Sequence, residues 1–333
     1  MCVLAASVLW GTTGTAATFA PAVGPLAIGA VAMGLGGLLQ AVTAARPIAR
    51  DRAALRARRG LVLLGAVAVA AYPLAFYTSM RLAGVAVGTV VSIGSAPPAA
   101  ALVERLVDRR RLTARWSAGA GLGLLGVVLL CVAEAARAHQ GAGAGSGSGA
   151  ATVLGVGLGL VAGVTYAVYS WAAHRLISGG TASRAAMGAV FGLGGLLLLP
   201  VLVVTGAPLL ASWSHAAVGA YMALVPMFAG YVLFGRGLAR VTATTATTLS
   251  LLEPAVAAVL AVVVVGERLP ALGWAGVALV VGCLAVLTAP ARPVRRPARA
   301  VRPSCGAPPV PSGRPVNGDV GPAPVALGRE PPE

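Results

Sequence analysis

Glu253 is the residue best suited to chemistry in this chain, because it is a carboxylic acid in the middle of a long apolar stretch. The stretch covers residues 241–265, and Pro254 directly follows the acid. A charged acid at the centre of a membrane costs about 2.5–3.5 kcal/mol, so such residues mark ion and substrate paths. Pro254 cannot donate a backbone hydrogen bond, which leaves a carbonyl one turn earlier without its partner. The pair predicts a polar spot where Glu253 binds a proton and a cationic substrate group in turn. The alternative is a protonated structural glutamate bonded to nearby backbone.

Further candidate site residues occur in pairs that lie 156 positions apart. At this offset, residues 82–101 and 238–257 match at seven of twenty positions. The same offset pairs Trp10 with Tyr166 and Ser92 with Thr248. We expect these four side chains to line a cavity near the membrane midplane. The alternatives are an interfacial belt or core packing for the aromatics, and hydroxyls that bond back to their own helix.

Prolines at matching places in the two halves predict interruptions of two helices. Pro97 and Pro98 fall in one apolar stretch and Pro254 falls in its counterpart. We expect these residues to break or kink their helices. Discontinuous helices at corresponding places are the best sequence indication of a transport site. A static kink without a role in binding is the alternative.

The elements that must position these residues are membrane-spanning helices. The chain has 333 residues, of which 58% are hydrophobic and 10% charged, and its mean hydropathy is +0.87. A soluble domain carries about 25% charged residues. A span needs about 20 apolar residues. Ten stretches meet this length approximately, and we predict an all-α polytopic membrane protein with spans at 2–20, 24–45, 61–80, 84–103, 116–133, 152–172, 185–204, 216–235, 241–265 and 269–289.

The arginines give these spans an orientation. With both termini in the cytoplasm, 22 of the 25 basic residues, all of them arginine, lie in inside segments and three lie outside. This asymmetry follows the positive-inside rule. It predicts a multi-pass protein of the cell membrane with cytoplasmic N- and C-termini, in contact with membrane lipids. It also accounts for the net charge of +16 without nucleic acid as a partner.

Each half of the chain holds five spans, which is an odd number, so the second half enters the membrane in the opposite sense. We predict a first five-helix repeat at 1–133, a Gly/Ser-rich outside linker at 134–151, a second repeat at 152–289 and a disordered cytoplasmic tail at 290–333. Inverted repeats of this kind build secondary transporters, with the substrate site between the halves.

Other classes of function fit the sequence less well. A P-loop is absent and the chain has no lysine to serve one, which excludes an ATP-driven pump on this chain. The three histidines lie near predicted loops, and Glu253 is the one carboxylate placed mid-membrane, so we expect no catalytic residues, no metal site and no cofactor. A passive channel or lipid-handling protein stays open as an alternative, and an intramembrane enzyme is less favoured.

Residues 251–287 resemble the EamA family of the drug/metabolite transporter superfamily. The resemblance is carried by Leu252-Glu253-Pro254, Gly266-Glu267-Arg268-Leu269, and Trp274 followed by Gly276 and Gly282, and in the first half by Leu9-Trp10-Gly11. The resemblance implies a ten-helix exporter of small metabolites or drugs, a small-molecule solute as partner and, in many members, exchange for protons. A homodimer is left open.

Overall fold

The computed structural model describes residues 1–109, 111–141, 149–266 and 268–289. Helices dominate these ranges, and no strand occurs in them, which confirms the predicted all-α class. The elements are α1 (Cys2–Ala17), α2 (Pro25–Thr43), α3 (Ala45–Arg50), α4 (Arg52–Ala57), α5 (Arg59–Ala83), α6 (Val85–Val107), α7 (Ala114–Gly141), α8 (Gly149–Ser178), α9 (Ser183–Thr205), η1 (Ala207–Leu210), α10 (Trp213–Met222), η2 (Ala223–Ala229), α11 (Gly230–Leu238), α12 (Ala243–Leu249), α13 (Leu252–Leu260), η3 (Ala261–Val265) and α14 (Ala271–Thr288).

Nine helical segments in the described ranges are long and apolar enough to cross a membrane. Two of them are composite: α10, η2 and α11 form one, and α12, α13 and η3 form another. The predicted first span corresponds to α1, which has 16 residues and is shorter than the other nine. Leucines and valines are exposed on the outer faces, such as Leu63 at 55% and Val67 at 58%. Helices suit this setting because they satisfy their backbone polar groups without water.

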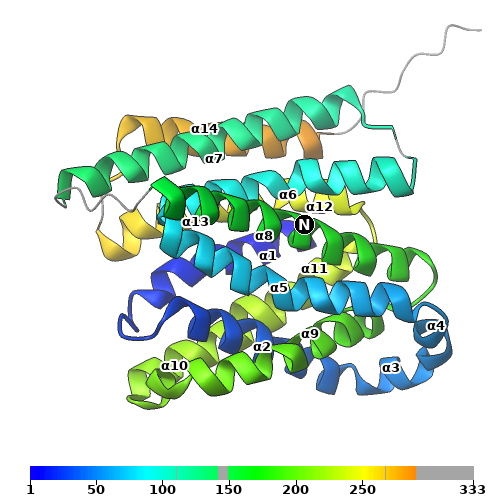
Figure 1. The fold of residues 1–333 in the computed structure, drawn as a ribbon. Helices are drawn as coiled ribbons and strands as arrows, with labels where there is room; N and C mark the ends of the chain where they lie inside the picture. The colour runs from blue at the N-terminus through cyan, green and yellow to red at the C-terminus, as the bar shows by residue number, and fades with distance from the viewer. Residues whose placement is uncertain (110, 142–148, 267, 290–333) are drawn as a thin grey trace, which may run out of the picture. The chain divides into compact units, whose positions relative to one another are not determined.

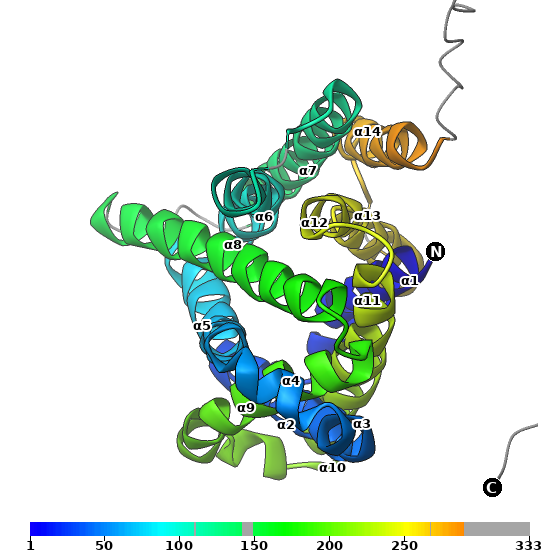
Figure 2. The same ribbon diagram turned by 90° about the vertical axis from the view of Figure 1, so that its right-hand side faces the viewer.

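The helices pack in pairs that join distant parts of the chain. α2 lies against α9, and α7 lies against α14 (Figure 1). α8 crosses α5 and α6, while α1 contacts α11 and α13 (Figure 2). Gly37 of α2 and Gly195 of α9 lie where those two helices meet, with no room for a side chain on either. Small residues at such crossings let backbones approach closely, which is the main source of helix association in lipid.

The bounds of several elements differ from the sequence-based expectation. α7 continues to Gly141 and α8 begins at Gly149, so much of the linker expected at 134–151 is helical. Residues 142–148 and the tail expected at 290–333 lie outside the described residues. α6 runs without interruption through Pro97 and Pro98, so the break expected there is absent and a kink remains a prediction. The ninth span is interrupted, at Ser250 and Leu251 between α12 and α13.

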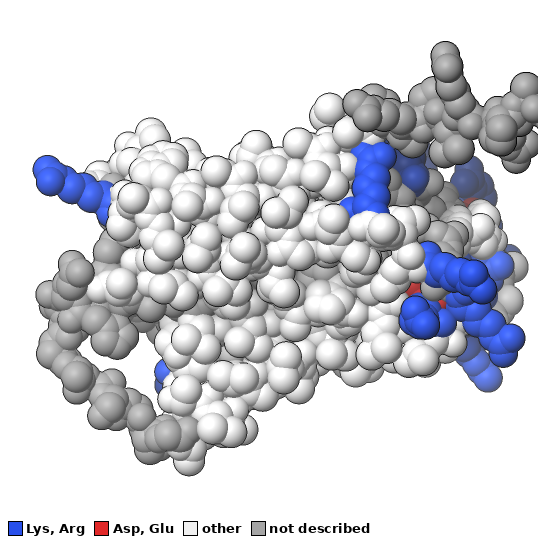
Figure 3. Space-filling view, turned by 90° about the horizontal axis from the view of Figure 1, so that it is seen from above, with Lys and Arg blue, Asp and Glu red and all other residues white. Residues whose placement is uncertain are grey.

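Arginines gather at one end of the helix bundle, around α3 and α4 (Figure 3). Side chains connect the loops at this end. Asp51, between α3 and α4, accepts a hydrogen bond from the backbone N–H of Ala182 at 2.7 Å and another from Arg50 at 3.1 Å. These two donors, the Ala182 amide first, hold the pKa of the Asp51 carboxyl below its ordinary value. The carboxylate therefore stays ionised at neutral pH and ties α3 and α4 to the start of α9.

The contact between α7 and α14 gives a direct test of the packing. A Cβ on Gly126 would lie 2.7 Å from the Gly276 carbonyl oxygen, whereas one on Gly121, on the same helix, would meet nothing within 4 Å. We expect Gly126→Val to separate the two helices and lower the free energy of unfolding by about 1–3 kcal/mol. Thermal unfolding of the protein in detergent measures this, with Gly121→Val as the matched control. Equal melting temperatures for the two variants would show that the crossing is not tightly packed.

Candidate functional site: a cavity around Glu253

A cavity of about 650 Å³ lies among the helices that carry Glu253, Trp10 and Tyr166. Its walls come from α1, α2, α5, α6, α7, α8, the composite span from α10 to α11, and α13. At one end it extends to Thr18 and Pro21, to Arg81 and Val85, and to Leu269. These residues lie in or beside connections between spans, at the end of the bundle away from α3 and α4. Ligand sites commonly have volumes of about 300–1,000 Å³, so this one suits a small organic solute.

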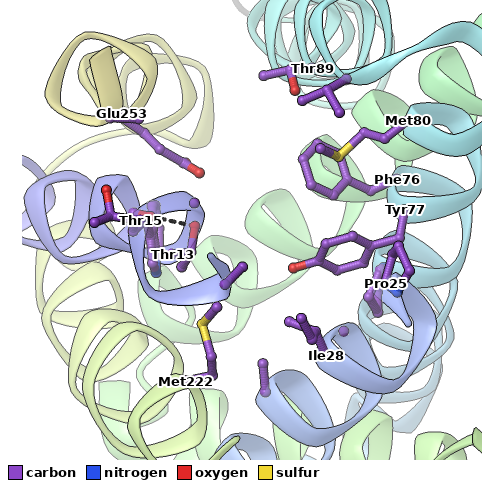
Figure 4. A pocket seen from close by; sticks show the side chains of 18 of the residues that line it. Thr13, Thr15, Pro25, Ile28, Phe76, Tyr77, Met80, Thr89, Met222 and Glu253 are labelled. Atoms are coloured by element: carbon purple, nitrogen blue, oxygen red, sulfur yellow. Dashed lines mark hydrogen bonds between the residues drawn. The ribbon is translucent and has the colours of Figure 1, made fainter. Parts of the chain in front are cut away.

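The break in the ninth span places Glu253 in the cavity wall. The backbone N–H of Glu253 bonds to the Ser250 carbonyl at 3.0 Å, and α13 begins at Leu252, so Glu253 is in the first turn of a new helix. Backbone N–H groups at a helix start favour a negative charge nearby. The carboxyl points into the cavity (Figure 4), and within the described ranges it makes no hydrogen bond or ion pair. Glu253 is therefore available to a proton or a solute.

Trp10 and Tyr166 meet in the cavity wall, as their pairing in the sequence suggested. Their ring centroids are 6.5 Å apart in an edge-to-face arrangement. Trp10 donates from Nε1 to the Pro226 carbonyl oxygen at 2.9 Å, and Tyr166 donates to the Ser250 hydroxyl at 2.7 Å. Pro226 lies in η2, a π-helical turn in the eighth span. Trp10 is thus bonded to the backbone of one irregular segment and Tyr166 to a side chain of another, and the second segment leads directly into Glu253.

Ser92 and Thr248 do not line the cavity, contrary to expectation. Thr248 is fully buried, donates to the Thr244 carbonyl of its own helix at 2.8 Å and accepts from Trp116 Nε1 at 3.0 Å. Ser92 is also fully buried, and its backbone lies beside Gly163 where α6 meets α8. The hydroxyls are turned into helix contacts, because a small polar side chain fits where two helices come close. Thr89, three residues before Ser92 on α6, is in the wall.

The largest part of the wall that the sequence reasoning missed belongs to α5. Tyr72, Phe76 and Tyr77 come from this helix, and Phe76 and Tyr77 face Glu253 across the cavity in Figure 4. Tyr231 of α11 adds a further ring, 4.8 Å from Trp10 between centroids. The signal was present in the sequence as three aromatics within six residues around Pro73, inside an apolar span. Nothing in that pattern indicates which neighbour the rings face.

The fold and cavity define a multi-pass membrane protein with a solute-sized internal site. The model of the EamA-like transporter family matches residues 1–132 and 153–289, and the chain belongs to this family. It is 34% identical over 290 residues to the uncharacterized transporter YwfM of Bacillus subtilis (strain 168), covering 86% of this chain and 93% of that protein. A solved crystal structure is similar at a TM-score of 0.69 and 23% identity, over 86% of this chain and 95% of that chain, which supports the fold.

Proposed function

We propose that this membrane transporter is a secondary active exporter of small metabolites or drugs, which works by alternating access in exchange for protons. The observation that carries the proposal is Glu253, whose carboxyl has no partner among the described residues and lies in the wall of a cavity of about 650 Å³, at a break in a spanning helix. A carboxyl in such a place can hold either a proton or a positively charged group of the solute. Because the carboxyl would hold either the proton or the cationic solute but not both, inward movement of the proton would be coupled to outward movement of the solute.

The contacts between helices support an inverted repeat with the substrate site between its halves. If the two repeats are equivalent, α1 corresponds to α8 and α5 corresponds to the span from α10 to α11. In the same way, α6 corresponds to the span from α12 to η3. The contacts of α8 with α5 and α6 then correspond to those of α1 with α11 and α13. The contact of α2 with α9 and the contact of α7 with α14 each join equivalent helices of the two repeats. Such an arrangement suits rocking of one half against the other around a fixed site.

We infer that this conformation faces outward. By the positive-inside rule, the end that carries α3 and α4 is cytoplasmic, with both termini on that side of the cell membrane. The cavity extends to Thr18, Arg81 and Leu269 at the opposite end, and its wall contains no residue of α3 or α4. A solute would reach Glu253 from outside and would leave to outside in this state.

Hydrogen bonds between helix ends close the cytoplasmic side in this proposal. Glu104, near the end of α6, is 4% exposed and accepts the backbone N–H of Thr244 at the start of α12 at 2.9 Å. Asp108 accepts from Trp171 Nε1 at 2.9 Å and pairs with Arg175 at 2.9 Å, which fixes α6 to α8. A hydrogen bond to a charged group contributes about 1.5–3 kcal/mol. Opening toward the cytoplasm requires the Glu104 contact to part.

A proteoliposome experiment tests the transport mode. Purified protein is reconstituted with a mixture of amines, amino acids and neutral metabolites at equal concentrations inside and outside the vesicles, and an inward proton gradient is imposed. We expect one class of solute to leave the vesicles against its own gradient while the lumen acidifies, and to be recovered chemically unchanged. Equilibration without net movement against the gradient would show a passive channel, the main alternative. A chemically altered solute would show an enzyme.

A further inference from the structure

We propose that the cavity selects organic ammonium ions with an aromatic or other apolar body. This inference rests on the proposed transport function and names the solute class for the same site. The features that support it, all among the described residues that line one cavity, are one carboxyl without a partner, a surrounding set of aromatic faces and a mostly apolar remainder.

The charge of the wall favours a cation. Glu253 is the one acidic side chain among the described residues that line the cavity, and it has no basic partner there. Its place in the first turn of α13 lets the backbone N–H groups of that turn support the negative charge once a cation is bound. A neutral solute cannot take the place of the proton on this carboxyl, because it brings no positive charge to balance the carboxylate, and an anion would be repelled by the carboxylate.

Aromatic rings surround the position that a cation at Glu253 would occupy. Tyr72, Tyr77, Tyr166 and Tyr231 line the same cavity as Glu253. Tyr72 stacks with its neighbour Phe76 at 5.6 Å between centroids, so several ring faces follow one another along the wall. A cation over such faces gains attraction from the ring quadrupole, more so away from water.

Two of these tyrosines also have free hydrogen-bonding capacity. Tyr166 and Tyr231 are engaged, with Ser250 and Tyr169 respectively. The hydroxyls of Tyr72 and Tyr77 make no hydrogen bond with the residues that the structure describes, and Tyr77 points into the cavity in Figure 4. An ammonium group has up to three N–H donors and no acceptor. The carboxylate and two phenol oxygens match that requirement.

Apart from the hydroxyls of Thr13, Thr15, Thr18 and Thr89 and the exposed Arg81, the remainder of the wall is apolar and adaptable. Four methionines line the cavity: Met33, Met80, Met222 and Met227. Their flexible thioethers pack against irregular shapes and make favourable contacts with aromatic rings. With about 650 Å³ available, the site has room for an aromatic body attached to the ammonium group, and it offers that body little polar contact.

Arg81 does not change this assignment. It lies in the last turn of α5, one helical turn beyond Tyr77 toward the mouth of the cavity, and its side chain is exposed. Charges at the surface are screened by water and salt, whereas those in the cavity wall are screened much less. Glu253 therefore dominates recognition inside the cavity.

The test is binding of matched probes to purified full-length protein by titration calorimetry at neutral pH. The probes share a phenyl body and differ in charge: 2-phenylethylammonium, 2-phenylethanol, 3-phenylpropanoate and phenylalanine. We expect the ammonium ion to bind roughly ten-fold or more tightly than the alcohol, with propanoate weakest. Equal or tighter binding of the alcohol or of propanoate would overturn the proposal. Tighter binding of phenylalanine would also overturn it, in favour of a zwitterion held by Glu253 and Arg81 together.

A pair of variants separates recognition from folding. Phe76→Leu keeps an apolar side chain but removes a ring face, and we expect it to weaken ammonium binding several-fold while leaving phenylethanol binding nearly unchanged. Phe19→Leu is the matched control, because Phe19 is 60% exposed and is not part of the wall. Equal loss for both probes in Phe76→Leu would indicate a purely steric role and contradict the aromatic part of the proposal.

Binding and flux together distinguish the two levels of inference. Glu253-dependent binding of the ammonium ion without flux in proteoliposomes would retain the solute class and reject transport of this class by the chain. Proton-coupled flux of other solutes, without ammonium binding, would retain the transporter and reject the solute class.

Discussion

Replacing Glu253 by glutamine is expected to reduce transport at least roughly ten-fold and to abolish its dependence on pH. Glutamine has nearly the same volume and retains a hydrogen-bonding end, but it neither takes up a proton nor supplies a negative charge. In the wild type, a lower external pH should speed release of a cationic solute from the outward cavity, because a proton on Glu253 displaces it. Solute efflux from proteoliposomes, measured at several external pH values, checks both expectations.

Two comparisons make the Glu253 result decisive. Glu253→Asp keeps the carboxyl on a side chain one methylene shorter, so it should transport more slowly than the wild type but retain a pH dependence. Unchanged thermal unfolding of Glu253→Gln would show that the loss is not one of folding. If Glu253→Gln transported at the wild-type rate with the wild-type pH profile, Glu253 would have a structural role and proton coupling through it would be wrong.

Joining α6 and α12 at the end of the bundle that we propose is cytoplasmic is expected to stop transport almost completely. The Glu104 carboxylate and the Thr244 backbone N–H are 2.9 Å apart, so cysteines at these two positions lie within reach of a short bis-methanethiosulfonate reagent, which joins them through two reducible disulfides. The four native cysteines, Cys2, Cys131, Cys283 and Cys305, are first replaced by serine or alanine. The crosslinked protein should still bind solute from the outer side, because the cavity extends to that end, but should lose flux until a reducing agent cleaves the link.

The single-cysteine proteins, treated with the same reagent, are the controls for this experiment. They should retain flux, apart from the effect of removing the Glu104 contact, which the untreated Glu104→Cys variant measures, since Thr244→Cys keeps the backbone N–H. Full flux through the crosslinked protein would contradict rocking of the halves at this end. Loss of solute binding together with flux would indicate a distorted cavity in place of a locked one.

The fold could be predicted from sequence because its main determinant is local. A stretch of about 20 apolar residues with few charges becomes a spanning helix in almost any context. Hydropathy therefore located the spans, although it could not foresee that α7 continues to Gly141. The arginine asymmetry depends only on position along the chain. An acid beside a proline in an apolar helix is equally visible, which is why Glu253 was identified before its cavity was known.

The composition of the cavity wall was decided by tertiary structure. The sequence singled out Glu253, Trp10 and Tyr166, and these line the cavity, but it also favoured Ser92 and Thr248, which do not. A spanning helix is apolar on all sides, so its sequence carries no amphipathic signal to indicate which face meets a neighbour and which meets a cavity.

Close approach of particular helices settled the remaining questions. Gly159 and Gly163 bring α8 against α5 and α6, which buries Ser92. The α5 helix presents Tyr72, Phe76 and Tyr77 to Glu253 from more than 170 residues away in the chain. Thus the sequence by itself determined the spans, the charge asymmetry and the acid. Which side chains surround that acid followed only from packing, because packing depends on shapes that neither helix specifies alone.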